Sequence, residues 1–490
     1  MAFALTVRER RSLALLVALV VAVRLATLGA YPLMDSTESR YAEIARKMLE
    51  TGDWVMPQFD YGVPFWGKPP LSTWLSALSM AAFGVNEFAA RLPSLLLVVG
   101  CGALVHSLAM LRGGRDQALW TLAPFAATGL VFIAAGAVMT DPALAFGTTL
   151  SMAGFWVAVN GPGPSRRVGG IAFFLGLAVG LLAKGPVAAV LTFLPIGAWT
   201  LWSRQWRAVA TALPWLAGAA LTAALAVPWY WAAERASPGF LDYFLIGEHW
   251  KRFVEAGWKG DLYGAAHARP RGMIWLFWIA AALPWSLLAL GWLGRAAIRR
   301  GGALRRIVTD PWQAYLILWA TAPMLFFTVS GNVLATYVLP GLPALALLVG
   351  ELWRPAAGAP HALRPAVRVM LAAALLLPVA FVAAIATQRN RFENELSHKA
   401  LVRMYEARRA SAAEQLVYVG QRPVSAEFYA RGRAVKVQDA AALLPYLADA
   451  NADFFVLRLR DVAALPETTR ARLTSLGEFG EYRLFREALR

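Results

Sequence analysis

Long apolar runs, separated by short charged segments, dominate the sequence. Charged residues make up 16% of the 490 residues and hydrophobic residues 58%, whereas a soluble protein carries about 25% charged residues. About 20 predominantly apolar residues are needed to cross the core of a bilayer. About eleven runs meet or approach this length: 12–30, 91–111, 117–136, 143–160, 168–183, 186–202, 208–231, 273–294, 311–329, 333–353 and 367–387. We therefore predict an all-α polytopic membrane bundle over residues 1–387; the run 74–84 is too short for a confident span.

Arginines are confined largely to alternate connections of this bundle. They cluster at 8–11, 112–115, 166–167, 204–207, 295–306 and 354–368. Cytoplasmic loops of membrane proteins carry such an excess of positive charge. This pattern, rather than nucleic-acid binding, accounts for the net charge of +17. It predicts a cytoplasmic N-terminus, an uncleaved first span and, with eleven spans, a C-terminal part on the opposite side.

The connections on that opposite side are longer and chemically richer. The two longest are residues 31–90 and 232–272, and every lysine lies in the outer connections or in the C-terminal tail. Long connections often carry function. Within the first, residues 39–52 repeat apolar side chains at helical spacing, opposite a charged face. We predict an amphipathic helix lying on the membrane surface or against the bundle.

Residues 388–490 differ from the rest of the chain. The segments "QLVYVG", "AVKVQ" and "DFFVLRL" predict strands, whereas 398–412, 439–449 and 461–475 predict helices. This alternation is typical of a small α/β domain, which we place on the periplasmic side.

Three carboxylates at the outer ends of spans are candidate catalytic groups. Asp35 with Glu38 three residues later fits a helix N-cap and capping box, and equally fits an acid that handles an acceptor group. Asp141 before Pro142 is typical of a helix start, yet it faces the same side. The two interpretations do not exclude each other.

Two lysines sit in proline-containing breaks of apolar sequence. Lys68 in "FWGKPPL" is suited to hold a phosphate or, alternatively, to reach lipid headgroups. Lys184 in "LAKGPV" lies at membrane depth, where a charge is costly and indicates function unless it snorkels from a helix end.

The second outer connection adds further candidates. Arginine binds phosphate well, whereas the His and Glu spacing gives only a weak signal for a metal. The substrate-binding candidates outside the two lysines are Arg40, Glu248, His249, Arg252, His267, Arg269 and Tyr337. Taken singly, each could be an ordinary solvated or packed residue. Together with the carboxylates they suit a substrate with a lipid tail, a phosphate and a polar head.

Several segments resemble one known family. "ESRYAEIARKMLETGDWVMPQFDYGVPFWGKPPLSTW" is similar to the first outer loop of bacterial lipid A aminoarabinose transferases, which belong to the protein mannosyltransferase-like group with the GT-C fold. Further similar segments, in the family's order over roughly residues 10–350, are "TDPALAF", "LAKGP", "YFLIGEHWKRF", "HARP", "ALPW" and "TYVLP".

The resemblance implies an inverting transferase that takes a sugar from a polyprenyl phosphate donor. Lys68 would hold the donor phosphate, Arg252 and Arg269 would lie in a donor-holding loop, and Asp141 and a first-loop acid would be essential carboxylates. The implied acceptor is a lipid A-type glycolipid or another envelope glycan, and the implied location is a bacterial inner membrane with a periplasmic active site. No cofactor is predicted with certainty, and a divalent metal is only weakly supported.

The sequence departs from the family pattern at three places. The family's Asp-Glu-x-Arg reads Thr37-Glu38-Ser39-Arg40, with an aspartate only at Asp35. The acid before the Lys-Pro motif is Gly67, and a Lys-Gly-Lys motif reads Ser330-Gly331-Asn332. Sugar and acceptor are therefore left open, and the alternatives are a protein O-glycosyltransferase or a non-enzymatic transporter or flippase of polyprenyl-linked sugars.

Overall fold

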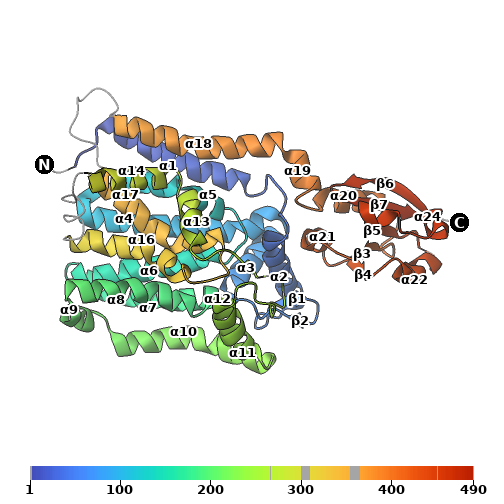
Figure 1. Ribbon diagram of the computed structural model, residues 1–490, viewed down its shortest axis with the longest axis horizontal. Coiled ribbons are helices and arrows are strands. Elements are labelled where there is room, and N and C mark those ends of the chain that lie inside the picture. The colour runs from blue at the N-terminus through green and yellow to red at the C-terminus, as the bar shows by residue number, and fades with distance from the viewer. Residues whose placement is uncertain (1–2, 265, 299–309, 354–364, 450, 489–490) are drawn as a thin grey trace.

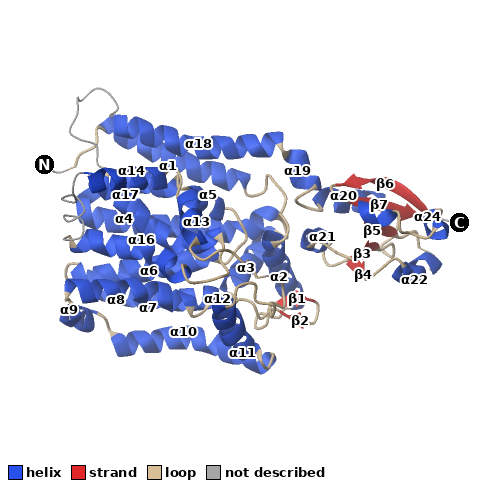
Figure 2. Cartoon of the chain, viewed as in Figure 1, coloured by secondary structure: helices blue, strands red, loops and turns tan. Residues whose placement is uncertain are grey.

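The chain forms a helical bundle with a small sheet-containing unit at one end (Figure 1). The computed structural model describes residues 3–264, 266–298, 310–353, 365–449 and 451–488. The predicted arginine clusters at 295–306 and 354–368 fall partly outside these residues. Helices fill the bundle, and the five-stranded sheet lies in the C-terminal unit (Figure 2).

Each predicted apolar run forms a helix. The long helices of the bundle are α1 (Val7–Thr27), α4 (Glu87–Ala126), α6 (Asp141–Asn160), α7 (Ser165–Lys184), α8 (Val187–Ser203), α10 (Trp215–Ala236), α16 (Pro311–Phe327), α17 (Leu342–Leu352) and α18 (Pro365–Thr387). The short helices α5 (Gly129–Ala134), α9 (Trp206–Ala212) and η2 (Ala335–Gly341) connect or extend them.

Several of the predicted runs are interrupted rather than continuous. Within α4, Gly114 has a non-helical backbone with φ of 74°, so the two predicted runs 91–111 and 117–136 form one broken element that continues into α5. The run 273–294 forms α13 (Met273–Ala281) and α14 (Trp285–Ile298), which meet at 114°. Among the described residues, six helices are long and apolar enough to cross a membrane, or seven with this bent pair.

The N-terminus and the C-terminal unit lie at opposite ends of the bundle (Figure 1). Arginine-bearing segments meet at the N-terminal end: Arg10 Nε lies 2.6 Å from Asp116, and Arg112 Nη2 lies 2.9 Å from Asp310. The arginine pattern of the sequence thus corresponds to one physical end of the molecule.

The first outer connection folds over the other end of the bundle. It contains α2 (Thr37–Thr51), a short hairpin of β1 (Gln58–Asp60) and β2 (Val63–Pro64), and α3 (Leu71–Phe83). The apolar stripe of α2, including Ala45 and Met48, packs in one cluster with Ala77 and Met80 of α3 and with Ala89 of α4. The predicted amphipathic helix is therefore present, and its apolar face lies against the bundle.

The C-terminal unit is built on a mixed sheet of strand order β4-β3-β5-β7-β6. The elements are α19 (Arg389–Asn394), α20 (Lys399–Arg408), β3 (Leu416–Val419), α21 (Val424–Tyr429), β4 (Ala434–Val437), η3 (Ala441–Leu443), α22 (Leu444–Ala448), β5 (Phe454–Arg458), α23 (Leu459–Val462), α24 (Glu467–Arg470), β6 (Leu473–Phe479) and β7 (Tyr482–Glu487). The three predicted strands are β3, β4 and β5. The single helix predicted over 461–475 is wrong, because α23 and α24 are four residues each and the chain then enters the β6–β7 hairpin.

The charged face of α2 is buried beneath this C-terminal unit. Lys47 is fully buried, with its Nζ 2.5 Å from Glu427 Oε1 of α21 and 3.3 Å from Asp60. Arg422 completes the network by pairing with Asp60 at 3.1 Å and with Glu427 at 2.8 Å. The charged face of α2 therefore forms an interface between two parts of the chain.

Candidate active site

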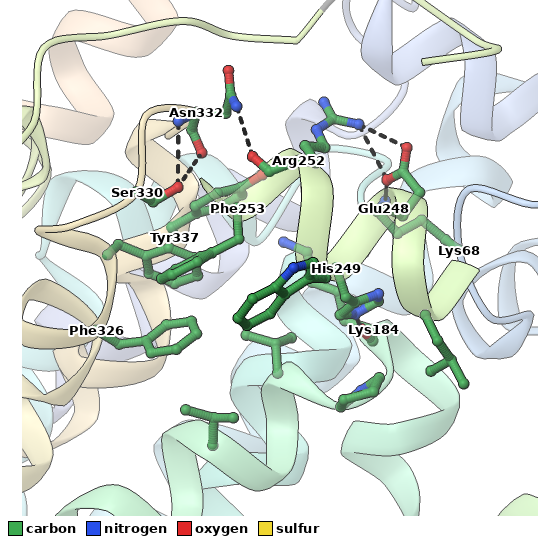
Figure 3. A pocket seen from close by; sticks show the side chains of 16 residues that line it. Lys68, Lys184, Glu248, His249, Arg252, Phe253, Phe326, Ser330, Asn332 and Tyr337 are labelled. Atoms are coloured by element: carbon green, nitrogen blue, oxygen red, sulfur yellow. Dashed lines mark hydrogen bonds and ion pairs between the residues drawn. The ribbon is translucent and has the colours of Figure 1, made fainter. Parts of the chain in front are cut away.

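A cavity of about 360 Å³ opens where the second outer connection meets the bundle. Its polar wall carries three cations, Lys68, Lys184 and Arg252, whereas Phe253, Phe326 and several aliphatic side chains form the remaining walls. Figure 3 shows these side chains converging from three separate parts of the fold. The arrangement suits an anionic group attached to an apolar chain.

Glu248 holds two of these cations in place. Glu248 lies in η1 (Tyr243–Lys251), between α11 (Phe240–Asp242) and α12 (Arg252–Val254). Lys68 Nζ lies 2.8 Å from Glu248 Oε2, and Arg252 Nη1 lies 2.9 Å from Oε1 (Figure 3). Burial alone would raise the pKa of Glu248, but Lys68 and Arg252 outweigh it and lower its pKa to about 2. Glu248 is therefore an anion that positions cations, because such a carboxylate is a poor base at neutral pH.

Lys184 and Asp141 form a second ion pair at the cavity wall. Lys184 Nζ lies 2.6 Å from Asp141 Oδ1 and 4.5 Å from the ring centre of Tyr337. Asp141 thus does not line the cavity itself but contacts Lys184, which does. Both residues sit at helix ends, Asp141 at the start of α6 and Lys184 at the end of α7.

The helix α7 ends after Lys184 at a position that requires glycine. Gly185 has φ of +75°, and a Cβ there would lie 2.6 Å from the Phe244 ring. His249 reaches the same break, with Nε2 3.1 Å from Lys184 O and Nδ1 2.7 Å from Phe244 O. Burial lowers the pKa of His249. Gly185 and His249 therefore fasten η1 to the end of α7 and fix the position of Lys184.

Asn332 contributes to the site in a way that the sequence does not indicate. Its Nδ2 donates to Arg252 O at 2.6 Å and to Glu255 O at 2.5 Å, and its Oδ1 accepts from Gly257 N at 2.9 Å. Asn332 lines the cavity and clamps the Arg252 segment to the bundle. Its only signal in the sequence is its place before "TYVLP", where the family pattern has a cation.

The two first-loop acids lie elsewhere. Asp35 accepts from Ser39 Oγ at 2.7 Å and from Ser425 N at 2.8 Å, so it joins the first outer connection to α21. Glu38 forms a bidentate pair with buried Arg91, at 2.7 and 2.8 Å, and also accepts from the backbone at Met34 and Val138. Neither residue lines the cavity. Both acids thus have structural partners away from the cavity, and their catalytic role stays a prediction.

The remaining candidates surround the cavity without lining it. Gly264 lies against the Arg40 guanidinium, with an ideal Cβ 3.5 Å from Nη2. Arg40 and Arg252 both lower the pKa of His267 after the larger effect of burial. His267 and Arg269 are exposed, and their segment pairs with residues 331–333 through the backbone. Among the described residues, no three His, Cys, Asp or Glu side chains are arranged to hold a metal ion.

Known proteins match both the sequence and the fold. The dolichyl-phosphate-mannose-protein mannosyltransferase family matches residues 10–244. The undecaprenyl phosphate-alpha-4-amino-4-deoxy-L-arabinose arabinosyl transferase of Erwinia tasmaniensis is 32% identical over 65% of this chain and 55% of its own length. The enzyme of the same name from Pseudomonas paraeruginosa is 34% identical over 64% of this chain and 54% of its own length. The chain therefore spans just over half the length of these relatives.

Solved structures agree with this match. The crystal structure of ArnT from Cupriavidus metallidurans bound to undecaprenyl phosphate superposes with a TM-score of 0.80 at 20% identity, covering 97% of this chain and 98% of that one. The same protein in the apo state gives a TM-score of 0.73 at 21% identity. The fold is thus the one seen in ArnT. In sequence the chain is similar to the aminoarabinose transferases named above.

Proposed function

We propose that this protein transfers a sugar from a polyprenyl phosphate to an acceptor at the outer face of a bacterial inner membrane. The observation that carries the proposal is the convergence of Lys68, Lys184 and Arg252 on one cavity whose other walls are apolar. Cations in such a site bind the phosphate, and the apolar walls accept the start of the polyprenyl chain. The names of the relatives and the undecaprenyl phosphate in the ArnT crystal support this choice of donor.

The reaction is a displacement at the anomeric carbon of the sugar. An acceptor oxygen attacks that carbon from the face opposite the phosphate, the bond from carbon to phosphate oxygen breaks, and the polyprenyl phosphate leaves with the electron pair. The configuration inverts. Lys68 and Arg252 stabilise the charge that develops on the leaving phosphate, an effect worth about 10²–10³ in rate per donor in comparable sites.

Asp141 has two possible uses in this displacement, which depend on the acceptor. If a hydroxyl attacks, its proton must leave, and Asp141, which contacts the lining residue Lys184, is the carboxylate that we assign as base. If a phosphate oxygen of a lipid A-type acceptor attacks, no base is needed. Asp141 then only orients Lys184 toward the donor.

The topology follows the same proposal. We assign eleven spans to α1, the two parts of α4, α6, α7, α8, α10, the bent pair α13–α14, α16, η2 with α17, and α18, although only six or seven of the described helices are by themselves long and apolar enough to cross a membrane. With an odd number of spans and arginines at the N-terminal end, the N-terminus is cytoplasmic and the cavity and residues 388–490 are periplasmic.

The test is a comparison of envelope glycolipids by mass spectrometry in cells that carry wild-type protein, Lys68→Ala or Lys251→Ala. Lys251 is an exposed neighbour on η1 that does not line the cavity, so it is a matched control. We expect a sugar-sized mass on lipid A in wild type and Lys251→Ala cells, and its loss in Lys68→Ala. A modification that persists in Lys68→Ala would refute the proposed phosphate site.

A protein acceptor is the second candidate, because the matching family transfers mannose to protein. An unchanged lipid A profile, together with glycosylated periplasmic proteins that vanish in Lys68→Ala cells, would favour it. A polyprenyl-linked sugar that accumulates on one membrane face with no modified acceptor would instead indicate a transporter.

A further inference from the structure

A second cavity, of about 380 Å³, lies between α1, α4 and α5 and shares no lining residue with the candidate active site. Its lining is apolar except for Arg24 and, at the far end, His106 and Ser107. On α4 the lining residues run from Leu95 to Ser107 at spacings of three and four, so they form one continuous stripe. The cavity is therefore an elongated groove with a cation at one end.

Arg24 is a buried cation whose hydrogen-bonding capacity is only partly used. It is 2% exposed, and its Nη2 donates to Tyr31 Oη at 3.1 Å and to Ile133 O at 3.2 Å. Its Nε and Nη1 are buried without a hydrogen-bond partner. Within the described part of the chain, no carboxylate forms an ion pair with Arg24. Leaving charged donors unpaired is costly, so this geometry points to a missing acceptor.

The surroundings hold the guanidinium in place without neutralising it. Its Cζ lies 4.6 Å from the ring centre of Phe381 and 5.3 Å from that of Phe132. A Cβ at Gly136 would lie 2.1 Å from Arg24 Cζ, so only glycine leaves room for the guanidinium there. Nearby Arg91 is already paired with Glu38, which leaves the positive charge of Arg24 uncompensated.

The groove has the length and the exposure expected for a lipid chain. The helical segment from Leu95 to Ser107 extends over about 18 Å. One leaflet of a bilayer core is about 15 Å thick. Val99 is 43% exposed, so the groove is open on one side to the surrounding lipid. Arg24 stands in the last turn of α1, at the end of the bundle where the outer leaflet has its headgroups.

We propose that this groove binds an anionic phospholipid of the outer leaflet, with one acyl chain along α4 and the phosphate accepting hydrogen bonds from Arg24. Charge complementarity selects the headgroup, because only an anion compensates Arg24. This site shares no residue with the proposed donor site, and only its assignment to the outer leaflet rests on the topology given under the proposed function.

Native mass spectrometry of the delipidated, detergent-purified full chain tests this proposal by titration with phosphatidylglycerol or phosphatidylcholine. We expect wild type to bind one phosphatidylglycerol with about tenfold preference, the effect of roughly one charge-assisted interaction. Arg24→Met should abolish the preference, and Arg24→Lys should keep most of it.

A second variant keeps the test decisive if Arg24→Met folds poorly. Ala103→Phe fills the groove from its open side and leaves Arg24 untouched, whereas Ala220→Phe places the same ring on an exposed position of α10 outside the groove. We expect Ala103→Phe to lose the bound lipid and Ala220→Phe and Lys68→Ala to retain it. Binding of both lipids alike by wild type, or retention by Ala103→Phe, would overturn the proposal. Loss in Lys68→Ala would place the lipid in the other cavity and would overturn it as well.

Discussion

Replacing Glu38 by Gln should destabilise the protein rather than disable its chemistry. All five N–H donors of Arg91 are engaged: two bond the Glu38 carboxylate, and three bond carbonyls of Leu28, Tyr31 and Pro32 at 2.7–2.8 Å. Arg91 is completely buried and Glu38 is 8% exposed. The pair therefore ties the end of α1, the start of α2 and α4 together.

The expected magnitude follows from this geometry. Gln in place of Glu38 leaves a buried guanidinium without its counter-charge, and its amide nitrogen faces an arginine donor. Removing one partner of a buried, fully bonded ion pair costs about 3–5 kcal/mol. At roughly 2 °C per kcal/mol, the low end for larger domains, we expect Tm to fall by about 6–10 °C.

The assay is thermal unfolding of the purified protein in one detergent, together with glycolipid modification per folded molecule. Glu50→Gln is the matched control, because it makes the same change on α2 in a half-exposed pair with Arg46. Exposed pairs contribute about 0.2–1 kcal/mol, so Tm should move by about 2 °C or less. A second comparison uses Glu38→Met and the double variant Glu38→Met with Arg91→Met. The double variant should be more stable than Glu38→Met alone, because it removes both buried charges together. A Glu38→Gln protein with unchanged Tm and no activity would refute this reasoning and return Glu38 to the chemistry.

Three further predictions concern other parts of the fold. Gly185→Ala should lower stability by about 1–3 kcal/mol, because it combines a strained φ with a clash against Phe244. The control Gly197→Ala lies in open space on α8 and should be neutral or slightly stabilising. Thermal unfolding compares the two variants, and equal Tm values would contradict the steric argument. The lowered pKa of Glu248 implies stability that is present above pH 4.5, the ordinary pKa of the group, and is lost as pH falls toward 2. In Lys68→Met this loss of stability should begin at a higher pH. Coincident Tm profiles of the two proteins between pH 2 and 6 would exclude the Lys68 charge as the cause of the lowered pKa. Asp35→Ala should weaken the docking of α21 by about 1–3 kcal/mol, because Ser425 loses its hydrogen-bond acceptor. Protease cleavage near residues 388–398 should therefore increase in Asp35→Ala but not in the control Ser411→Ala, which changes an exposed position. Equal cleavage of the two variants would refute the docking role of Asp35.

Local sequence pattern predicted the helices of the bundle and three of the seven described strands, because a bilayer requires long apolar runs and a helix or strand repeats its apolar side chains at a regular spacing. The apolar runs, α2 and the strands β3 to β5 follow from these periods. The β6–β7 hairpin did not, because the sequence LTSLGEF of β6 places its apolar side chains at every third residue instead of every second one. The site was predicted in part: Lys68, Lys184, Glu248 and Arg252 meet in one cavity, and each comes from a segment that stands out by composition.

The roles of other polar residues depend on partners far away in the sequence. Glu38 pairs with Arg91, and Asp35 with Ser425, and no local period encodes such pairings. The sequence likewise does not show what covers the charged face of α2, because its partners Arg422 and Glu427 lie far away in the chain. A candidate acid can therefore be recognised by type from sequence, but its use is decided by the tertiary contact.

The interface between α2 and α21 also has a consequence for the order in which the molecule is completed. Lys47 is synthesised early, whereas its partner Glu427 emerges from the ribosome only after the whole bundle. Until then Lys47 and Asp35 face water, and the first outer connection lacks its cover. A nascent chain that stalls before residue 422 would contain every residue of the cavity lining but would leave the helix that borders it unsecured. Maturation of the outer face is therefore a post-insertion event, and its timing can be followed by pulse-chase proteolysis.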